Sequence, residues 1–275
     1  MKRGTRALTS VFDIKFCPKS KRSQATVFII VGVLIVSIIV LFFILRSGVI
    51  PGTGGGHETN PNAFLESCME DKIKETAETI SLQGGSMNNP LHKRFKFDGE
   101  NYVNISYLCY NQNYYFPCIN QEPVLIQHLK DEIKEGIKVE VEDCFTKLGK
   151  SLDNQGYTVD ATYRGFEVEL MPRKIIVEID ANMTLTKTEE SLRYENFTII
   201  TASKFYDLAI LAQEIVSQEA EFCNFELLGF MLLYPEFNID KLRTSDSTII
   251  YTIKHEDSEE NFRFAIRGCV IPPVF

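Results

Sequence analysis

Cysteines are the residues of this sequence with the most evident chemistry. There are seven, of which Cys17 precedes a long apolar run and the other six follow it. The six are Cys68, Cys109, Cys118, Cys144, Cys223 and Cys269. An even number of thiols on one side of an apolar segment is typical of a disulfide-bonded domain in an oxidising compartment. No pair has C-x-x-C spacing and the four histidines are scattered, so the sequence predicts neither a metal site nor a cofactor.

The pairing of six cysteines is not resolved by sequence alone, but some pairs are favoured. Cys109 and Cys118 flank the segment YNQNYYFP, whose Asn-rich centre suits a tight turn, so we expect them to join a hairpin. Cys68 and Cys144 each lie in a helical pattern and could tie two helices together. That arrangement leaves Cys223 with Cys269. Buried free thiols are the alternative.

The same hairpin segment gathers the aromatic residues that are most suggestive of a binding surface. The candidates are Tyr107, Tyr110, Tyr114 and Tyr115, with Tyr102 and Phe116 beside them. Tyrosine is enriched at binding surfaces because it combines a large contact area with a hydroxyl group. The alternative is that the tyrosines pack on their own domain, as residues of an aromatic hairpin often do.

Three sequons are candidate glycosylation sites. Their asparagines are Asn104, Asn182 and Asn196, each followed two residues later by Ser or Thr. All three follow the apolar run, so glycan attachment is compatible with an external position.

Catalytic patterns are absent from the sequence. There is no G-x-S-x-G elbow, no H-E-x-x-H and no phosphate-binding loop in a strand-to-helix context. Acidic pairs such as Glu167 with Glu169 alternate along predicted strands, which places them on a solvated face. His255 lies beside Glu256 and Asp257, but the sequence identifies no nucleophile that this histidine could activate. We therefore do not expect an enzyme, and an envelope enzyme of unknown reaction is the least favoured interpretation.

A membrane anchor is predicted by the run from Ala25 to Leu45, which is 21 residues long and uncharged. As a helix it would span roughly 31 Å, close to the thickness of a bilayer hydrocarbon core. The run ends in LFFILR, without the small residues of a signal-peptidase site. We expect a tail over residues 1–23, a transmembrane helix over 24–46 and a Gly- and Pro-rich stalk over 47–62.

The charge distribution predicts the orientation of this anchor. Residues 1–46 hold eight basic residues and one acid, whereas residues 47–275 hold 21 basic and 36 acidic residues, a formal charge of −15. Positive flanks stay in the cytoplasm, so the N-terminus is expected inside and the C-terminal domain outside. An acidic external domain offers no basic groove for phosphates, which disfavours nucleic acid as a partner. The expected partners are the lipid bilayer and, outside it, other envelope proteins or glycans.

The external domain is predicted to comprise residues 63–275. It begins with two helices and a hairpin. One helix runs from Asn62, its expected cap, to Gly84, with apolar residues three and four apart. A strand, turn and strand follow over residues 102–119. The second helix lies within residues 121–148, and Gly136 weakens its centre. Its apolar residues in register are Ile126, Leu129, Ile133, Ile137, Val141 and Cys144.

The remainder alternates between strands and one further helix. Segments 165–171, 173–187 and 194–203 alternate apolar and polar residues, which predicts an antiparallel meander with one solvated face. Residues 204–223 predict an amphipathic helix, with Phe222 on its apolar stripe and Glu219 interrupting it. The run 226–234 has no assigned type, and segments 247–255 and 261–271 predict two closing strands. The fold class is α+β, as one domain or as two subdomains that meet near residues 151–157.

The first residues of the anchor carry a resemblance. The segment KRSQATVF, residues 21–28, resembles archaeal class III leaders, the type IV pilin-like signals, with Phe28 where Glu is frequent. The resemblance implies cleavage between Ser23 and Gln24 and assembly of the apolar helix into a filament. The layout also resembles uncharacterised membrane-anchored envelope proteins of small-genome archaea, which have a Cys-bearing helix ending in Gln-Gly-Gly, here residues 83–85. That resemblance implies no activity.

Taken together, these features predict a single-pass cell-surface protein with a binding or structural role at the envelope. A pilin-like filament subunit is the alternative.

Overall fold

The computed structural model describes residues 30–36, 60–188 and 190–271. The chain divides into two units, residues 1–57 and residues 58–275. Residues 30–36 of the first unit are helical, and among the described residues no helix is long and apolar enough to cross a membrane. The rest of the predicted span 24–46, the cleavage position at Ser23 and Gln24, and residues 47–59 of the stalk lie outside the described residues.

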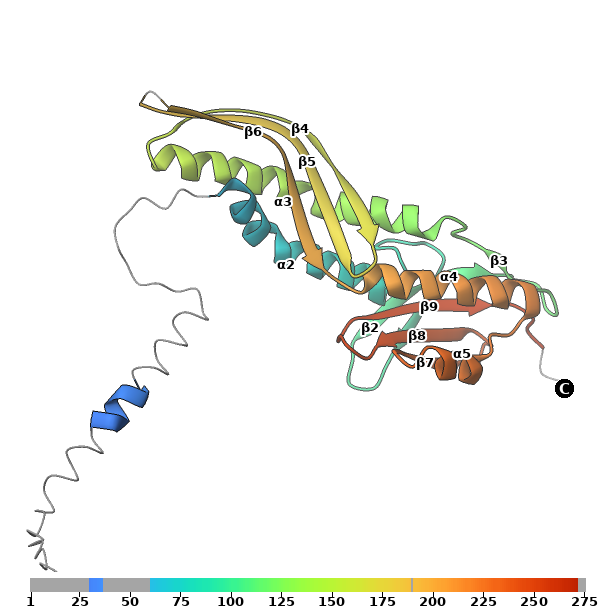
Figure 1. Cartoon of the computed structure of the whole chain (residues 1–275). Coiled ribbons are helices and arrows are strands. Elements are labelled where there is room, and N and C mark those ends of the chain that lie inside the picture. Colours follow the sequence, from blue (N-terminus) through green and yellow to red (C-terminus); the bar gives the residue numbers. More distant parts are fainter. Residues whose placement is uncertain (1–29, 37–59, 189, 272–275) are drawn as a thin grey trace, which may run out of the picture. The chain divides into compact units, whose positions relative to one another are not determined.

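The second unit contains helices and two sheets, as an α+β fold requires (Figure 1). In chain order its elements are α2 (Pro61–Leu82), β1 (His92–Lys96), β2 (Tyr102–Tyr110), β3 (Ile119–Asn120), α3 (Leu125–Asn154), β4 (Thr158–Met171), β5 (Lys174–Lys187), β6 (Glu190–Ala202), α4 (Phe205–Phe222), α5 (Leu227–Leu233), β7 (Phe237–Arg243), β8 (Ile249–His255) and β9 (Asn261–Arg267).

Helix α2 buries the apolar stripe that its sequence predicts: Leu65, Met69, Ile73, Ala77 and Ile80. Its cap differs from the prediction. Asn60 is the N-cap and its side chain accepts a hydrogen bond from the Asn62 amide at 3.1 Å. Pro61 then occupies the first turn, where its missing N–H is not needed. The helix cap therefore lies two residues earlier than predicted, within the expected stalk 47–62.

Helix α3 runs antiparallel to α2, and two contacts fix their register. Cys68 of α2 faces Cys144 of α3, and Thr76 of α2 faces Gly136 of α3. The second contact lies eight residues later in α2 and eight residues earlier in α3, as an antiparallel pair requires. A β-carbon at Gly136 would lie 2.6 Å from the Thr76 methyl group, so glycine permits this close approach. The helix is longer than predicted and continues to Asn154.

Strands β4, β5 and β6 form the predicted antiparallel meander, which packs on the α2–α3 pair. Phe166, Val168 and Leu170 lie buried on one face, as their alternation predicts. The register shifts between Tyr163 and Gly165 on β4 and between Ile179 and Asn182 on β5. Bulges of this kind bend a sheet, and the three long strands curve together in Figure 1.

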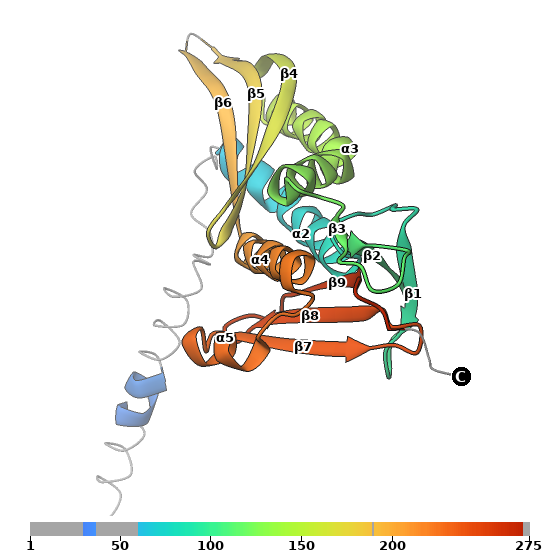
Figure 2. The same ribbon diagram turned by 90° about the vertical axis from the view of Figure 1, so that its right-hand side faces the viewer.

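The second sheet has the order β1-β2-β9-β8-β7, with β3 paired to β2. Strand β2 lies parallel to β9, while the other neighbours are antiparallel. Strands β1 and β7 were not predicted. Helix α4 packs over this sheet (Figure 2).

One apolar core joins the two sheets. It includes Val177 and Phe197 from the meander and Tyr251 and Phe262 from the second sheet. Residues 58–275 form one compact unit, and α3 continues to Asn154, within the region 151–157 where two subdomains would meet.

Helices α4 and α5 correct two expectations. The apolar stripe of α4 ends differently than predicted, because Phe222 is exposed and Glu219 is buried. The run 226–234 contains the short helix α5, which leaves Leu228, Leu232 and Leu233 exposed.

Candidate functional site

The structure separates the four candidate tyrosines into two groups. Tyr107 is buried, and its hydroxyl lies 2.8 Å from the Thr248 hydroxyl. Burial raises the pKa of Tyr107. Tyr110 is half-buried and packs edge-on against Tyr107, with 5.0 Å between ring centroids. These two tyrosines are therefore packing residues, as the alternative interpretation had it.

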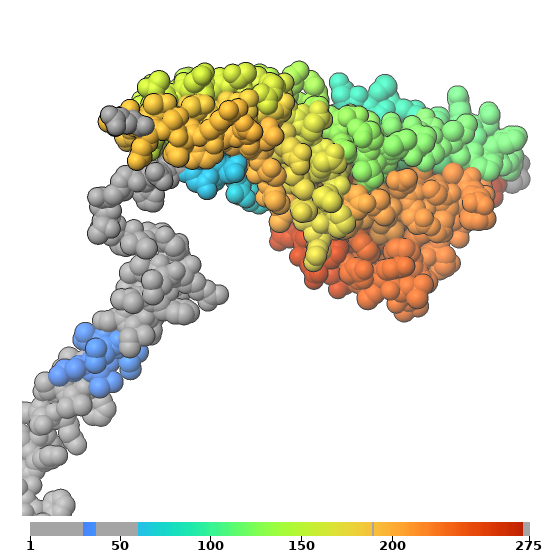
Figure 3. Space-filling view, turned by 45° about the horizontal axis from the view of Figure 1, so that its top comes forward, coloured from blue at the N-terminus to red at the C-terminus, as the bar shows by residue number. Residues whose placement is uncertain are grey.

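Tyr114 and Tyr115 lie instead in the exposed connection that leads from β2 to the first residue of β3, residues 111–119, which we call the tip loop. Tyr114 is 51% exposed, Tyr115 67% and the adjacent Phe116 60%. Ile119 is exposed as well. Three successive aromatic side chains that face solvent are unusual for a monomer surface and mark a candidate interaction site. In the space-filling view the green residues of this region occupy one end of the unit (Figure 3).

Two disulfides hold the base of the tip loop. Cys109–Cys118 closes the loop, with a Cα–Cα distance of 5.3 Å. Cys223–Cys269 ties the end of α4 to the segment after β9, against which the loop lies. These are pairs that the sequence favoured.

Backbone hydrogen bonds fasten the loop to the end of β9. The Tyr115 amide donates to the Val270 carbonyl at 3.0 Å, and the Cys269 amide donates to the Phe116 carbonyl at 2.6 Å. At the start of the loop the Asn111 amide donates to the Arg267 carbonyl at 2.7 Å. The loop is therefore held at both its start and its centre.

Close packing at Gly268 explains why the loop follows β9 so tightly. A β-carbon at this position would lie 2.7 Å from the Cys118 backbone nitrogen and 2.8 Å from its β-carbon. Any larger residue would push the Cys109–Cys118 bridge away from the strand. The tip loop is thus a fixed platform, and its conformation is set mainly by contacts outside the aromatic side chains.

Arg267 connects the buried and exposed tyrosines. Its guanidinium lies 5.9 Å from the ring centroids of both Tyr110 and Tyr114. It also donates a hydrogen bond to the Asn111 carbonyl. Arg267 comes from the far end of the sequence, so sequence reasoning missed it, and no local signal could have found it.

A cleft of about 320 Å³ lies elsewhere, between α2, the start of α4 and the turn before β9. Ala77, Phe205 and Leu208 give it an apolar wall, and its polar lining is Lys74, Glu78, Ser81, Glu259, Glu260 and Asn261. The Ser81 hydroxyl donates to the Asn261 carbonyl at 2.5 Å. Several of these polar groups are therefore occupied by contacts within the fold.

The polar residues next to this cleft serve the start of α4. Glu260 accepts hydrogen bonds from the Ser203 hydroxyl at 2.7 Å and from the Lys204 amide. Ser203 in turn accepts from the Phe205 amide at 3.0 Å. Side chains in this arrangement satisfy the free amides of a helix start. His255 contacts Lys204, with 3.2 Å between their side-chain nitrogens, and is not bonded to Ser203 in the described structure.

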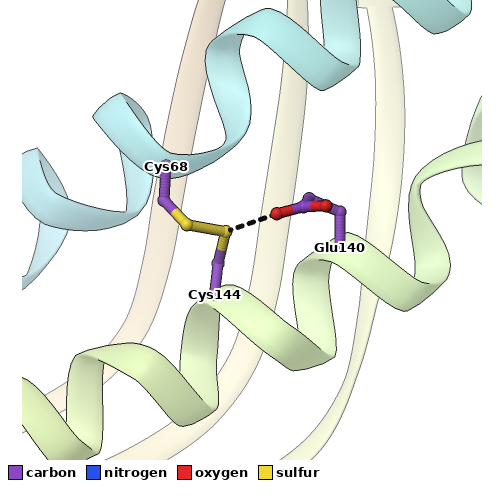
Figure 4. A group of neighbouring side chains, drawn as sticks. All are labelled: Cys68, Glu140 and Cys144. Atoms are coloured by element: carbon purple, nitrogen blue, oxygen red, sulfur yellow. Dashed lines mark hydrogen bonds between the residues drawn. A yellow bond between two sulfur atoms is a disulfide. The ribbon is translucent and has the colours of Figure 1, made fainter.

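One group of potential metal ligands is found among the described residues: Cys68, Glu140 and Cys144 (Figure 4). The two sulfur atoms form a disulfide that joins α2 to α3, and Glu140 lies 3.4 Å from the Cys144 sulfur. Metal binding by cysteine requires thiolates. The group therefore acts as a covalent link between the two helices.

The three sequons lie on strands with different accessibility. Asn104 is exposed on β2, but Ser106 of the same sequon is buried. Asn182 on β5 is half-buried. Asn196 and Thr198 are both exposed on β6, where Asn196 has a left-handed backbone with φ of 55°. Asn196 is the sequon that the folded domain presents most fully.

Comparison with known proteins gives no match: no family model, curated sequence or solved structure is significantly similar to this chain.

Proposed function

We propose that this protein is a single-pass, membrane-anchored cell-surface protein whose C-terminal domain binds a partner at the envelope through the tip loop. The anchor is residues 24–46, the N-terminal tail is cytoplasmic, and the domain is external. The lipid bilayer is a partner of the anchor.

One observation carries this proposal. All six cysteines after the apolar run are paired in disulfides, whereas Cys17 lies before it. Disulfides persist in oxidising compartments and are rare in the cytosol of most organisms. The charge asymmetry across the run supports the same orientation.

The tip loop supports the binding role. Aromatic residues are enriched at binding surfaces, and two disulfides fix the loop before any partner arrives. A surface fixed in advance loses less conformational entropy on binding, which favours affinity.

Protease digestion of intact cells tests the topology. A C-terminal epitope tag should be lost on digestion, and a tag at the N-terminus should survive. Alkylation before and after reduction should leave the six external cysteines unmodified until reductant is added. A C-terminal tag that stays protected, or a chain that fractionates with the cytosol, contradicts the proposal.

Intact-mass measurement on the extracted protein separates the anchor from the pilin-like alternative. The full chain is expected. A chain that begins at Gln24 would identify a processed leader and favour a filament subunit.

A further inference from the structure

The tip loop lies in the longest uncharged stretch of the C-terminal domain. Residues 101–121 contain no charged residue, although 24% of the whole chain is charged. The two residues that precede the three exposed aromatic residues of the loop, Gln112 and Asn113, have exposed carboxamide side chains. Within the described part of the chain these two side chains have no hydrogen-bond partner, so their donors and acceptors are available.

This combination of groups suits a sugar ring. The face of an aromatic ring is negatively polarised, and it attracts the positively polarised C–H groups on the apolar face of a pyranose. A carboxamide offers both a donor and an acceptor, which matches the paired hydroxyl groups at the edge of a sugar. Tyr114 and Tyr115 add hydroxyl groups of their own.

We propose that the tip loop binds a neutral glycan. This inference rests on the proposed function, because it names the partner of the same surface. The loop itself has no charged residue, and the guanidinium next to it, that of Arg267, is half-buried and hydrogen-bonded to the Asn111 carbonyl. The formal charge of −15 on residues 47–275 repels anionic polysaccharides and thus disfavours them as ligands. The same charge disfavours docking on an anionic lipid surface.

The geometry also disfavours a peptide partner. Protein hot spots usually insert into pockets or grooves on the partner surface. No tip-loop residue lines the cleft between α2 and α4, and the aromatic side chains of the loop project into solvent.

Binding of the full-length chain in lipid nanodiscs to immobilised polysaccharides tests the inference. The neutral probes are dextran, mannan and laminarin, and the anionic probes are heparin and alginate. Empty nanodiscs serve as the control for binding by lipid alone. The protein in nanodiscs is also measured at raised salt. We expect retention on at least one neutral polysaccharide, and unchanged affinity in high salt because no ion pair is involved.

Single substitutions then locate the surface. Tyr115→Ala and Phe116→Ala should each weaken binding about tenfold or more, the loss typical of an interface hot spot. Tyr102→Ala is the matched control: this tyrosine is 64% exposed but lies at the other end of β2. The control should bind within about twofold of the parent chain, since it removes an aromatic ring of similar exposure. Melting temperature and disulfide content verify that each variant is folded.

The inference is overturned if no neutral polysaccharide is retained, if heparin or alginate alone is retained and salt abolishes it, or if Tyr102→Ala weakens binding as much as Tyr115→Ala. Tip-loop variants that change only self-association or attachment to lipid also overturn it. None of these outcomes affects the protease test of topology, so the two proposals fail separately.

Discussion

The carboxylate of Glu219 on α4 accepts a hydrogen bond from the hydroxyl of Tyr251 on β8, and both side chains are buried in the core. Lys241 on β7 donates to the same carboxylate oxygen at 2.9 Å. Glu219 is only 3% exposed. A buried carboxylate needs such partners because burial removes its hydration. The three residues thereby fix the end of α4 on the second sheet.

Removal of the Tyr251 hydroxyl should therefore destabilise the protein. Tyr251→Phe is expected to lower the free energy of unfolding by about 1–2 kcal/mol, because the buried carboxylate loses one of its donors. Urea denaturation measures the change. Tyr115→Phe is the control, since that hydroxyl is in solvent, and it should alter stability by less than about 0.5 kcal/mol. A Tyr251→Phe variant as stable as the parent would show that Lys241 alone satisfies Glu219.

Alkaline pH should weaken the protein through the same tyrosine. Burial raises the pKa of Tyr251, and the hydrogen bond to Glu219 and its negative charge raise it further. A pKa raised on folding contributes stability that is complete below the ordinary tyrosine pKa of about 10 and is lost as pH rises above it. Stability should begin to fall at about pH 10, the ordinary tyrosine pKa, and should continue to fall as the pH rises further. The fall should be smaller in Tyr251→Phe, and parallel pH profiles for the two proteins would contradict this assignment.

Two glycines of α3 should respond in opposite directions to alanine. Gly136→Ala would place a β-carbon 2.4 Å from the Met87 methyl group and 2.6 Å from the Thr76 methyl group. Met87 can move, but Thr76 is buried, so we expect a loss of about 1–3 kcal/mol. At Gly149 no atom beyond the adjacent backbone of the same helix lies within 4 Å of the added carbon, and alanine should stabilise the helix by up to about 1 kcal/mol. Chemical denaturation measures the free energy of unfolding of both variants. Equal changes in the two variants would contradict the close approach of α2 and α3 at Gly136.

The disulfides should differ in what they stabilise. Cys68–Cys144 spans 76 residues, and its removal by paired serine substitution should cost about 4 kcal/mol, because it restricts the unfolded chain most. Cys109–Cys118 spans nine residues, and its removal should lower the free energy of unfolding by about 2–3 kcal/mol. Its loss should nevertheless reduce tip-loop binding more than loss of Cys68–Cys144. Urea unfolding and polysaccharide retention should be measured on both double-serine variants. The prediction is contradicted if the variant that loses more stability also loses more polysaccharide binding.

Elements at the edges of the second sheet show where sequence reasoning failed. Strand β1, HKRFK, and strand β7, FNIDKLR, are the two ends of the order β1-β2-β9-β8-β7. Edge strands of natural sheets carry charged residues, which oppose pairing with other chains. The same charges weaken the alternation of apolar and polar residues by which strands are recognised, so the unpredicted strands are those with the least apolar pattern.

Glu219 and Phe222 show a second kind of failure. Helical periodicity places both on the apolar stripe of α4, but it cannot show what lies opposite each position. Tyr251 and Lys241 lie opposite Glu219 and satisfy its charge, so the polar residue is buried. Phe222, the last residue of α4, is left exposed.

The sequence by itself determined the parts of this protein that depend on local pattern. The stripes of α2 and α3, the meander of β4 to β6 and the turn between Cys109 and Cys118 follow from residues that are neighbours in the chain. Only the tertiary structure decided the parallel pairing of β2 with β9, the approach of Arg267 to Tyr114, and which tyrosines face solvent. The physical reason is that these contacts join segments about 150 residues apart, and burial there depends on the packing of both.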